Sequence, residues 1–208
     1  MAGKKAAYSN SKDLRMRERL AQEAARLIAE EGIKDFQVAK QKAALRLHAP
    51  QTHNLPRNDE IKAALQEYQR LFKADTQPRQ LRRLREIGRA AMVYFEAFEP
   101  RLVGAVLDGT ADEFSEITLH LFTDTVEELT IHLLNQGIPF EQLSLRPTMP
   151  NGDTCEVPGY RLVMQEAPVL LLVFERKGLR QAPRCPTTGK PMERFSLNRV
   201  EELLRLED

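Results

Sequence analysis

The chain has no tryptophan, only two cysteines and few aromatic residues, which make up 6% of its 208 residues. Cys155 and Cys185 are too few for a disulfide framework, and their separation does not match the paired spacing of a zinc site. The sequence also lacks an apolar run long enough to span a bilayer, and no apolar segment follows its first lysines as in a secretory signal. We therefore expect a soluble, cytoplasmic protein with no membrane association.

The net charge is small, but the charges are unevenly distributed along the chain. Residues 1–90 contain 20 Lys and Arg against 11 Asp and Glu, whereas residues 91–208 contain 11 against 19. The two halves therefore carry +9 and −8, which gives the overall charge of +1. A basic front half can bind nucleic acid, dock on the acidic half or remain solvated. These alternatives stay open, as does the oligomeric state.

Helical periodicity dominates the first half of the chain. We expect a disordered start over residues 1–12 and a helical region over residues 13–98. Apolar side chains recur there with the spacing of one helix face. The pattern predicts four helices, at residues 13–31, 36–48, 58–72 and 80–98. Most arginines of the fourth helix are expected on its outer face: Arg79, Arg82, Arg83, Arg85 and Arg89.

Residues 99–208 alternate between strand and helix patterns, which predicts an α/β (α+β) fold. Strands are expected at residues 116–122, 140–145, 160–164 and 169–174. Helices are expected between residues 124 and 137 and from Ser196 to Leu206. The run Val169–Phe174 is apolar without alternation, which is typical of a strand covered on both faces. We therefore expect this strand near the centre of the sheet.

The strand at residues 116–122 alternates between apolar and polar side chains. Strand side chains point to opposite faces in turn, so Ile117 and its two apolar partners should enter the core. Glu116, Thr118 and His120 should then share the other face. A carboxylate, a hydroxyl and an imidazole on one face form a candidate site.

An apolar strand that ends in Gly104 and Ala105, a loop with Gly109, and then the run Ser115–Leu119 resemble the signature of the nucleotidyltransferase superfamily, the polymerase-beta-like fold. The resemblance implies a small mixed sheet in residues 99–208, with an N-terminal helical region and a C-terminal helix. It also implies a nucleoside triphosphate and magnesium as ligands of an active member. The implied nucleotide-binding positions are Gly104, Ala105, Gly109 and Ser115, and the implied catalytic positions are Glu116, Thr118 and His120.

The sequence departs from this family's pattern at its chemical positions. Glu116 replaces the first aspartate, Thr118 replaces the second, and Ala105 replaces a common phosphate-binding serine. The later strand is apolar until Glu175, so it supplies no third carboxylate within its length. Divalent cations in such sites prefer several anionic oxygens. No metal ligand is therefore assigned.

Three functional readings follow from these residues. The first is a degenerate nucleotidyltransferase-like domain that lacks the complete metal triad and acts as a binding or regulatory module. The second is an active, divergent enzyme in which Glu116, with Glu175 or Asp108, holds a cation. The third is a nucleic-acid-binding protein that uses the basic residues 1–90.

Overall fold

The computed structural model describes the backbone of residues 2–207 and the side chains of residues 13–207. The chain divides into two compact units, an N-terminal unit of residues 1–75 and a C-terminal unit of residues 76–208. Each unit has its own hydrophobic core. The fourth predicted helix belongs to the C-terminal unit, whereas the sequence pattern grouped it with the helices before it.

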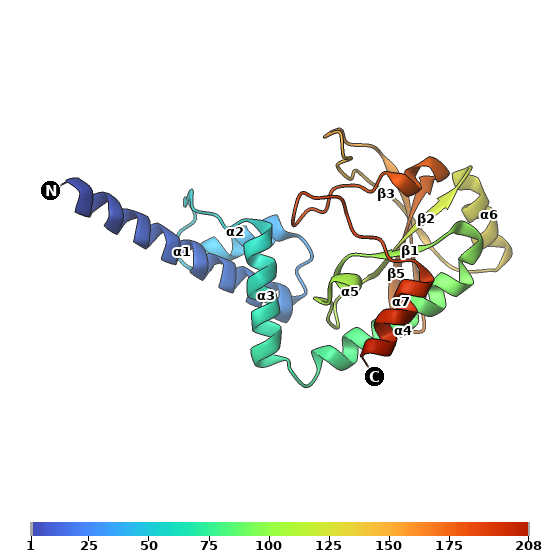
Figure 1. Ribbon diagram of the computed structural model, residues 1–208, viewed down its shortest axis with the longest axis horizontal. Coiled ribbons are helices and arrows are strands. Elements are labelled where there is room, and N and C mark those ends of the chain that lie inside the picture. Colours follow the sequence, from blue (N-terminus) through green and yellow to red (C-terminus); the bar gives the residue numbers. More distant parts are fainter. Residues whose placement is uncertain (1, 208) are drawn as a thin grey trace. The chain divides into compact units, whose positions relative to one another are not determined.

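The N-terminal unit is helical, as Figure 1 shows. Its three helices are α1 (Ala2–Glu31), α2 (Phe36–Arg46) and α3 (Asn58–Phe72). Asp35 begins α2, because its side chain accepts hydrogen bonds from the backbone N–H groups of Gln37 and Val38. The predicted disorder of residues 1–12 stays a prediction, since their side chains lie outside the described part of the chain.

The C-terminal unit contains a five-stranded mixed sheet with the strand order β1-β2-β5-β4-β3. The strands are β1 (Arg101–Val103), β2 (Ile117–Thr123), β3 (Glu141–Leu145), β4 (Val157–Met164) and β5 (Ala167–Glu175). β2 runs parallel to β5, and the other neighbouring pairs are antiparallel. The mixed α/β architecture and the central position of the apolar strand are therefore confirmed.

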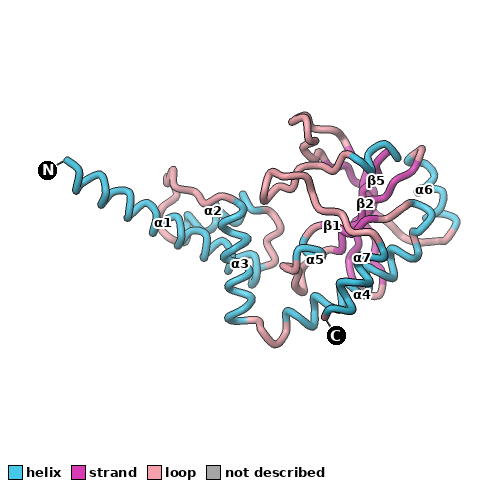
Figure 2. Tube along the Cα trace, viewed as in Figure 1, coloured by secondary structure: helices cyan, strands magenta, loops and turns pink. Residues whose placement is uncertain are grey.

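Helices cover one face of this sheet. They are α4 (Gln77–Tyr94), α5 (Ala105–Asp108), α6 (Val126–Asn135) and α7 (Leu197–Leu206), which Figure 2 distinguishes from the strands by colour. The main core contains Ile117, Leu119 and Leu121 of β2 together with apolar side chains of α4, α6 and α7. The face of β2 that was predicted to enter the core is therefore confirmed.

The opposite face of the sheet is also covered. A second apolar cluster contains Phe122, Leu172 and Phe174, and Leu179 packs against it. Leu179 belongs to η2 (Arg176–Arg180), a short 3-10 helix that follows β5 and contacts both β2 and β5. The segment after β5 thus closes the face on which the candidate site was expected.

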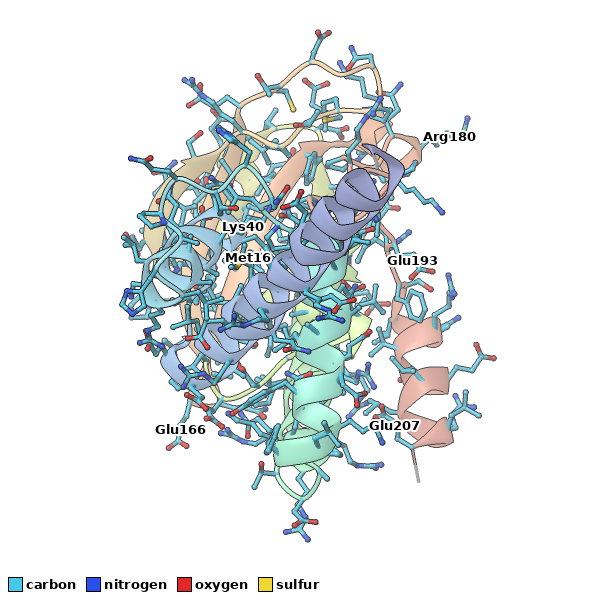
Figure 3. All side chains as sticks on the ribbon, turned by 90° about the vertical axis from the view of Figure 1, so that its left-hand side faces the viewer. Met16, Lys40, Glu166, Arg180, Glu193 and Glu207 are labelled. Atoms are coloured by element: carbon cyan, nitrogen blue, oxygen red, sulfur yellow. The ribbon has the colours of Figure 1, made fainter. Side chains whose placement is uncertain are left out.

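Arg85 is an exception to the expected outward row of arginines on α4. Only 5% of its surface is exposed. Its Nε donates to the backbone oxygen of Val106 at 2.9 Å, and its Nη2 donates to that of Leu107 at 3.1 Å. Its Nη1 also pairs with Glu207, which follows the end of α7 and is labelled in Figure 3. Arg85 therefore ties α4 to both α5 and the C-terminal end of α7.

Candidate functional site

Gly104 makes the turn between β1 and α5. Its backbone has φ 75° and ψ −154°, a conformation that side chains other than hydrogen rarely tolerate. A Cβ at this position would lie 3.9 Å from both Cβ and Oγ1 of Thr118. Ala105 follows directly as the first residue of α5. The structure thus brings the predicted positions 104 and 105 to the same end of β2 as Thr118.

Gly109 and Ser115 have local structural partners. Gly109 ends α5 with φ 82°, and its backbone oxygen accepts a hydrogen bond from Gln77 Nε2 at 3.0 Å. Ser115 Oγ donates to Asp112 Oδ1 and accepts from the Asp112 backbone N–H, each at 3.0 Å. These contacts shape the loop between α5 and β2.

Glu116 lies immediately before β2 and forms an ion pair with a strand that is not its neighbour. Arg161 on β4 donates from Nε to Glu116 Oε1 at 2.6 Å and from Nη1 to Glu141 Oε2 at 3.0 Å. Only 13% of the Glu116 side chain is exposed. The hydrogen bond that Arg161 donates to Glu116, and to a smaller extent the one it donates to Glu141, raises the pKa of Arg161. A fixed positive charge therefore neutralises the best candidate metal ligand.

The strand register explains why Arg161 reaches Glu116. Thr118 pairs with Leu170 of β5, Leu170 pairs with Arg161 of β4, and Arg161 pairs with Glu141 of β3. These four residues form one row across the sheet, so their side chains share a face. The long arginine side chain crosses over Leu170 towards β2. Sequence reasoning missed Arg161 because its partner lies 45 residues away.

His120 is buried against the segment that follows β5. It is 1% exposed, its ring centroid lies 4.7 Å from that of Phe174, and its Nδ1 accepts a hydrogen bond from Arg194 Nε at 3.0 Å. Because the guanidinium is a donor only, Nδ1 carries no proton. Burial, assisted by the charge of Arg194, lowers the pKa of His120 to about 3. His120 is therefore a neutral acceptor for the partly buried guanidinium of Arg194.

Arg194 is a second residue that sequence reasoning missed. Its guanidinium lies 5.0 Å from the ring centroid of Phe122 and 5.2 Å from that of Phe174, within the range of cation–π contacts. Its Nη1 donates to the backbone oxygen of Gly178 at 2.7 Å. Burial, together with the charge of Arg101, lowers the pKa of Arg194 to about 10. Arg194 thus fastens the segment after β5 onto the sheet.

The oxygen atoms at the β2 face do not fit a divalent cation. Thr118 supplies a neutral hydroxyl, and the carboxylate of Glu116 is bound to Arg161. In the strand register, Glu175 of β5 lies opposite Thr123 of β2. Thr123 is six residues after Ile117, so Glu175 lies about 20 Å along the strand from the Ile117 end of β2. Glu175 also forms an ion pair with Lys177 at 2.6 Å. Hard cations of this type require several negative oxygens at one point, whereas the two carboxylates beside Arg161, those of Glu116 and Glu141, are both bound to its guanidinium.

Several described cations of the N-terminal unit form ion pairs within it. Arg17 binds Glu60 at 2.8 Å, and Arg46 binds Glu23 at 3.3 Å. Arg26 binds Glu23 at 2.7 Å and Glu30 at 2.9 Å. The excess of basic residues at the front of the chain is therefore partly neutralised within its own unit.

Comparison of the chain with protein-family models, with curated proteins and with solved structures gave no match. Among the described residues, no helix combines the length and the apolar character needed to cross a membrane. A function can therefore be inferred only from the geometry of β2 and its neighbours.

Proposed function

We propose that residues 76–208 form a nucleotidyltransferase-like domain that acts as a nucleotide-binding or regulatory module and lacks the complete catalytic metal triad. The order of elements supports this proposal. β1 ends at Gly104, the short α5 follows, and β2 then pairs in parallel with the later strand β5. The positive φ of Gly104 brings the start of α5 against Thr118, as a phosphate-binding turn beside a catalytic strand would require.

The ion pair between Glu116 and Arg161 is the observation that favours binding over catalysis. The guanidinium lies 2.6 Å from the carboxylate and supplies a positive charge where an active enzyme would need a metal cation. A metal ion that binds Glu116 would have to displace Arg161, and the positive charge of Arg161 would then lose Glu116 as its partner. A nucleotide bound at this face would therefore depend little on magnesium.

Calorimetric titration with ATP, CTP, GTP and UTP, each with and without magnesium, tests this proposal. We expect the affinity for the preferred nucleotide to change by no more than about twofold when magnesium is removed, since a tenfold change would require about 1.4 kcal/mol. We also expect no transfer of a nucleotide to an acceptor. The proposal fails if none of the four binds. Magnesium-dependent transfer that is lost in Glu116→Ala but retained in the exposed control Glu127→Ala would instead establish the active enzyme.

A groove on the C-terminal unit favours nucleic-acid binding as a second candidate function. Its volume is about 580 Å³, and its lining includes Arg82 and Arg89 of α4 and Arg205 of α7. Glu86 and Glu201 also line it, at 3.1 Å from Arg82 and 3.8 Å from Arg89. Within residues 1–90, Arg82 and Arg89 are therefore the arginines that we propose contact phosphates.

Fluorescence anisotropy with labelled DNA duplexes and RNA single strands tests this second candidate. Binding should weaken steeply with salt, and replacing Arg82 and Arg89 with glutamine should lower the slope of log K against log salt by about one for each lost phosphate contact. Replacing the exposed Arg176 and Lys177 should leave that slope unchanged. Equal slopes for both double variants would exclude the α4 groove as the binding surface.

A further inference from the structure

A groove in the N-terminal unit lies between α1 and α3. Its volume is about 500 Å³. Four residues of α1 line one wall with the spacing of a single helix face, starting at Arg19 and ending at Arg26. The opposite wall comes from α3 and is mainly apolar, with Ala64, Tyr68 and Leu71 among its residues. The groove is therefore continuous along about two turns of both helices.

At the end of α3, two large exposed apolar side chains line this groove. Leu71 is 55% exposed and Phe72 is 70% exposed. The ring of Phe72 lies 4.8 Å from that of Tyr68, so the two aromatic residues form one apolar surface. Contiguous exposed apolar surface of this kind is typical of a binding surface in soluble proteins.

The core of the N-terminal unit gives a physical reason for association. Seven of the eleven buried residues in its two apolar clusters are alanines. Alanine contributes little apolar area on burial, and small helical units gain much of their stability from association. Burying Leu71 and Phe72 against a second apolar surface would add the large side chains that this core lacks.

The charges on the two walls are arranged for a partner with the same surface. The α3 wall carries Glu67, whose carboxylate binds Arg70 at the exposed outer side of the helix. The α1 wall carries Arg19, which forms no ion pair within residues 13–207. Arg26 on the same wall is occupied by Glu23 and Glu30. Among the described side chains, the wall of α1 therefore presents a cation without an ion pair, and the wall of α3 presents a carboxylate whose pair with Arg70 is exposed to solvent and therefore weak.

We propose that this groove is a self-association surface that binds the same groove of a second copy of the chain. In a two-fold symmetric pair, the same surface patch of both copies is in contact, so the protruding side chains of one copy must fit a groove in the other. Leu71 and Phe72 at the end of the groove provide the protruding side chains, and the rest of the groove provides the hollow that receives them. In this pair we expect Arg19 of each copy to lie opposite Glu67 of the second copy. This charge complementarity selects a second copy as the occupant.

Sedimentation velocity of the full chain over a range of concentrations tests the proposal. The wild type should form a dimer, and Leu71→Asp should shift it to the mass of one chain. Leu45→Asp is the matched control, because Leu45 is 62% exposed on α2 but does not line the groove. Circular dichroism should show that both variants keep the helix content of the wild type.

Charge reversal separates this pairing from other modes of association. Arg19→Glu and Glu67→Arg should each raise the dimer dissociation constant by about tenfold or more, because every contact occurs twice in a symmetric dimer. The double variant should restore the wild-type constant. A wild type that stays monomeric at its highest soluble concentration would overturn the proposal. So would a dimer that tolerates Leu71→Asp, or single reversals that the double variant does not correct.

Discussion

Replacing Arg85 with methionine is expected to lower the free energy of unfolding of the C-terminal unit by about 3 kcal/mol or more. Methionine keeps the aliphatic part of the side chain and removes the guanidinium. The backbone oxygens of Val106 and Leu107 then lose their donors, and Glu207 loses its ion-pair partner. Burial removes water from the Arg85 guanidinium and so lowers its pKa. The three partners offset this cost of desolvation. Each orphaned acceptor adds to the cost.

Urea unfolding followed by circular dichroism measures this loss, and hydrogen exchange localises it. The backbone amides of Asp108 and Thr110 donate to Gly104 and Ala105, so their exchange should accelerate when α5 loses its attachment to α4. Arg83→Met is the matched control on the same helix. The Arg83 side chain is 47% exposed, so its replacement should change stability by no more than about 0.5 kcal/mol. Equal effects of the two substitutions would contradict the role given to Arg85.

The apolar pattern was sufficient to predict the main elements of the C-terminal unit. Val169–Phe174 lacks alternation, and it lies in the central strand because both faces of that strand are covered. Ile117 and Leu119 recur with a period of two, and both enter the main core. These predictions succeed because burial is determined by the period of the strand itself, which is a local property of the sequence.

The position of Arg85 was also encoded locally, although its charge obscured the pattern. Leu81, Leu84, Arg85 and Gly88 are spaced as one helix face, and all four are buried. A charged residue on the apolar face of a helix indicates that buried groups bind its charge. The partners themselves, at the end of α5 and after α7, could not be predicted from the helix alone.

The environment of β2 depended on segments far away in the sequence. Alternation placed Glu116, Thr118 and His120 on one face, but it could not show what covers that face. Arg161 and Arg194 lie 45 and 74 residues away from their partners on or next to β2. Only the strand order and the path of the chain after β5 bring these arginines to the strand. The fold was therefore more predictable than the chemistry of the candidate site.

The burial of His120 predicts that the C-terminal unit loses stability as the solution becomes acidic. An unfolded histidine takes up a proton near pH 6.5, whereas the folded His120, with a pKa of about 3, remains neutral. Between these values the unfolded state binds more protons than the folded state. The contribution of neutral His120 to the free energy of unfolding is therefore complete above about pH 6.5. Below that pH it falls by about 1.4 kcal/mol for each pH unit towards pH 3.

His120→Asn isolates this contribution. Asparagine can place an acceptor oxygen near the position of Nδ1, so the hydrogen bond from Arg194 Nε can persist without a group that titrates. The smaller side chain should lower stability by a similar amount at every pH. The wild type should lose about 2 kcal/mol more than the variant between pH 7.5 and pH 5, since carboxylates elsewhere contribute equally to both proteins.

Unfolding free energies of the two proteins at both pH values provide the test, and nuclear magnetic resonance of the imidazole ring provides an independent one. The ring should remain the neutral tautomer with the proton on Nε2 down to about pH 4, because protonation of Nδ1 would remove the acceptor of Arg194 and create a buried positive charge beside its guanidinium. A ring that titrates near pH 6.5, or equal acid losses in the two proteins, would contradict the buried contact. If the ring stays neutral and the wild type loses more unfolding free energy at low pH than the variant, the contact between His120 and Arg194 holds the segment after β5 on the sheet.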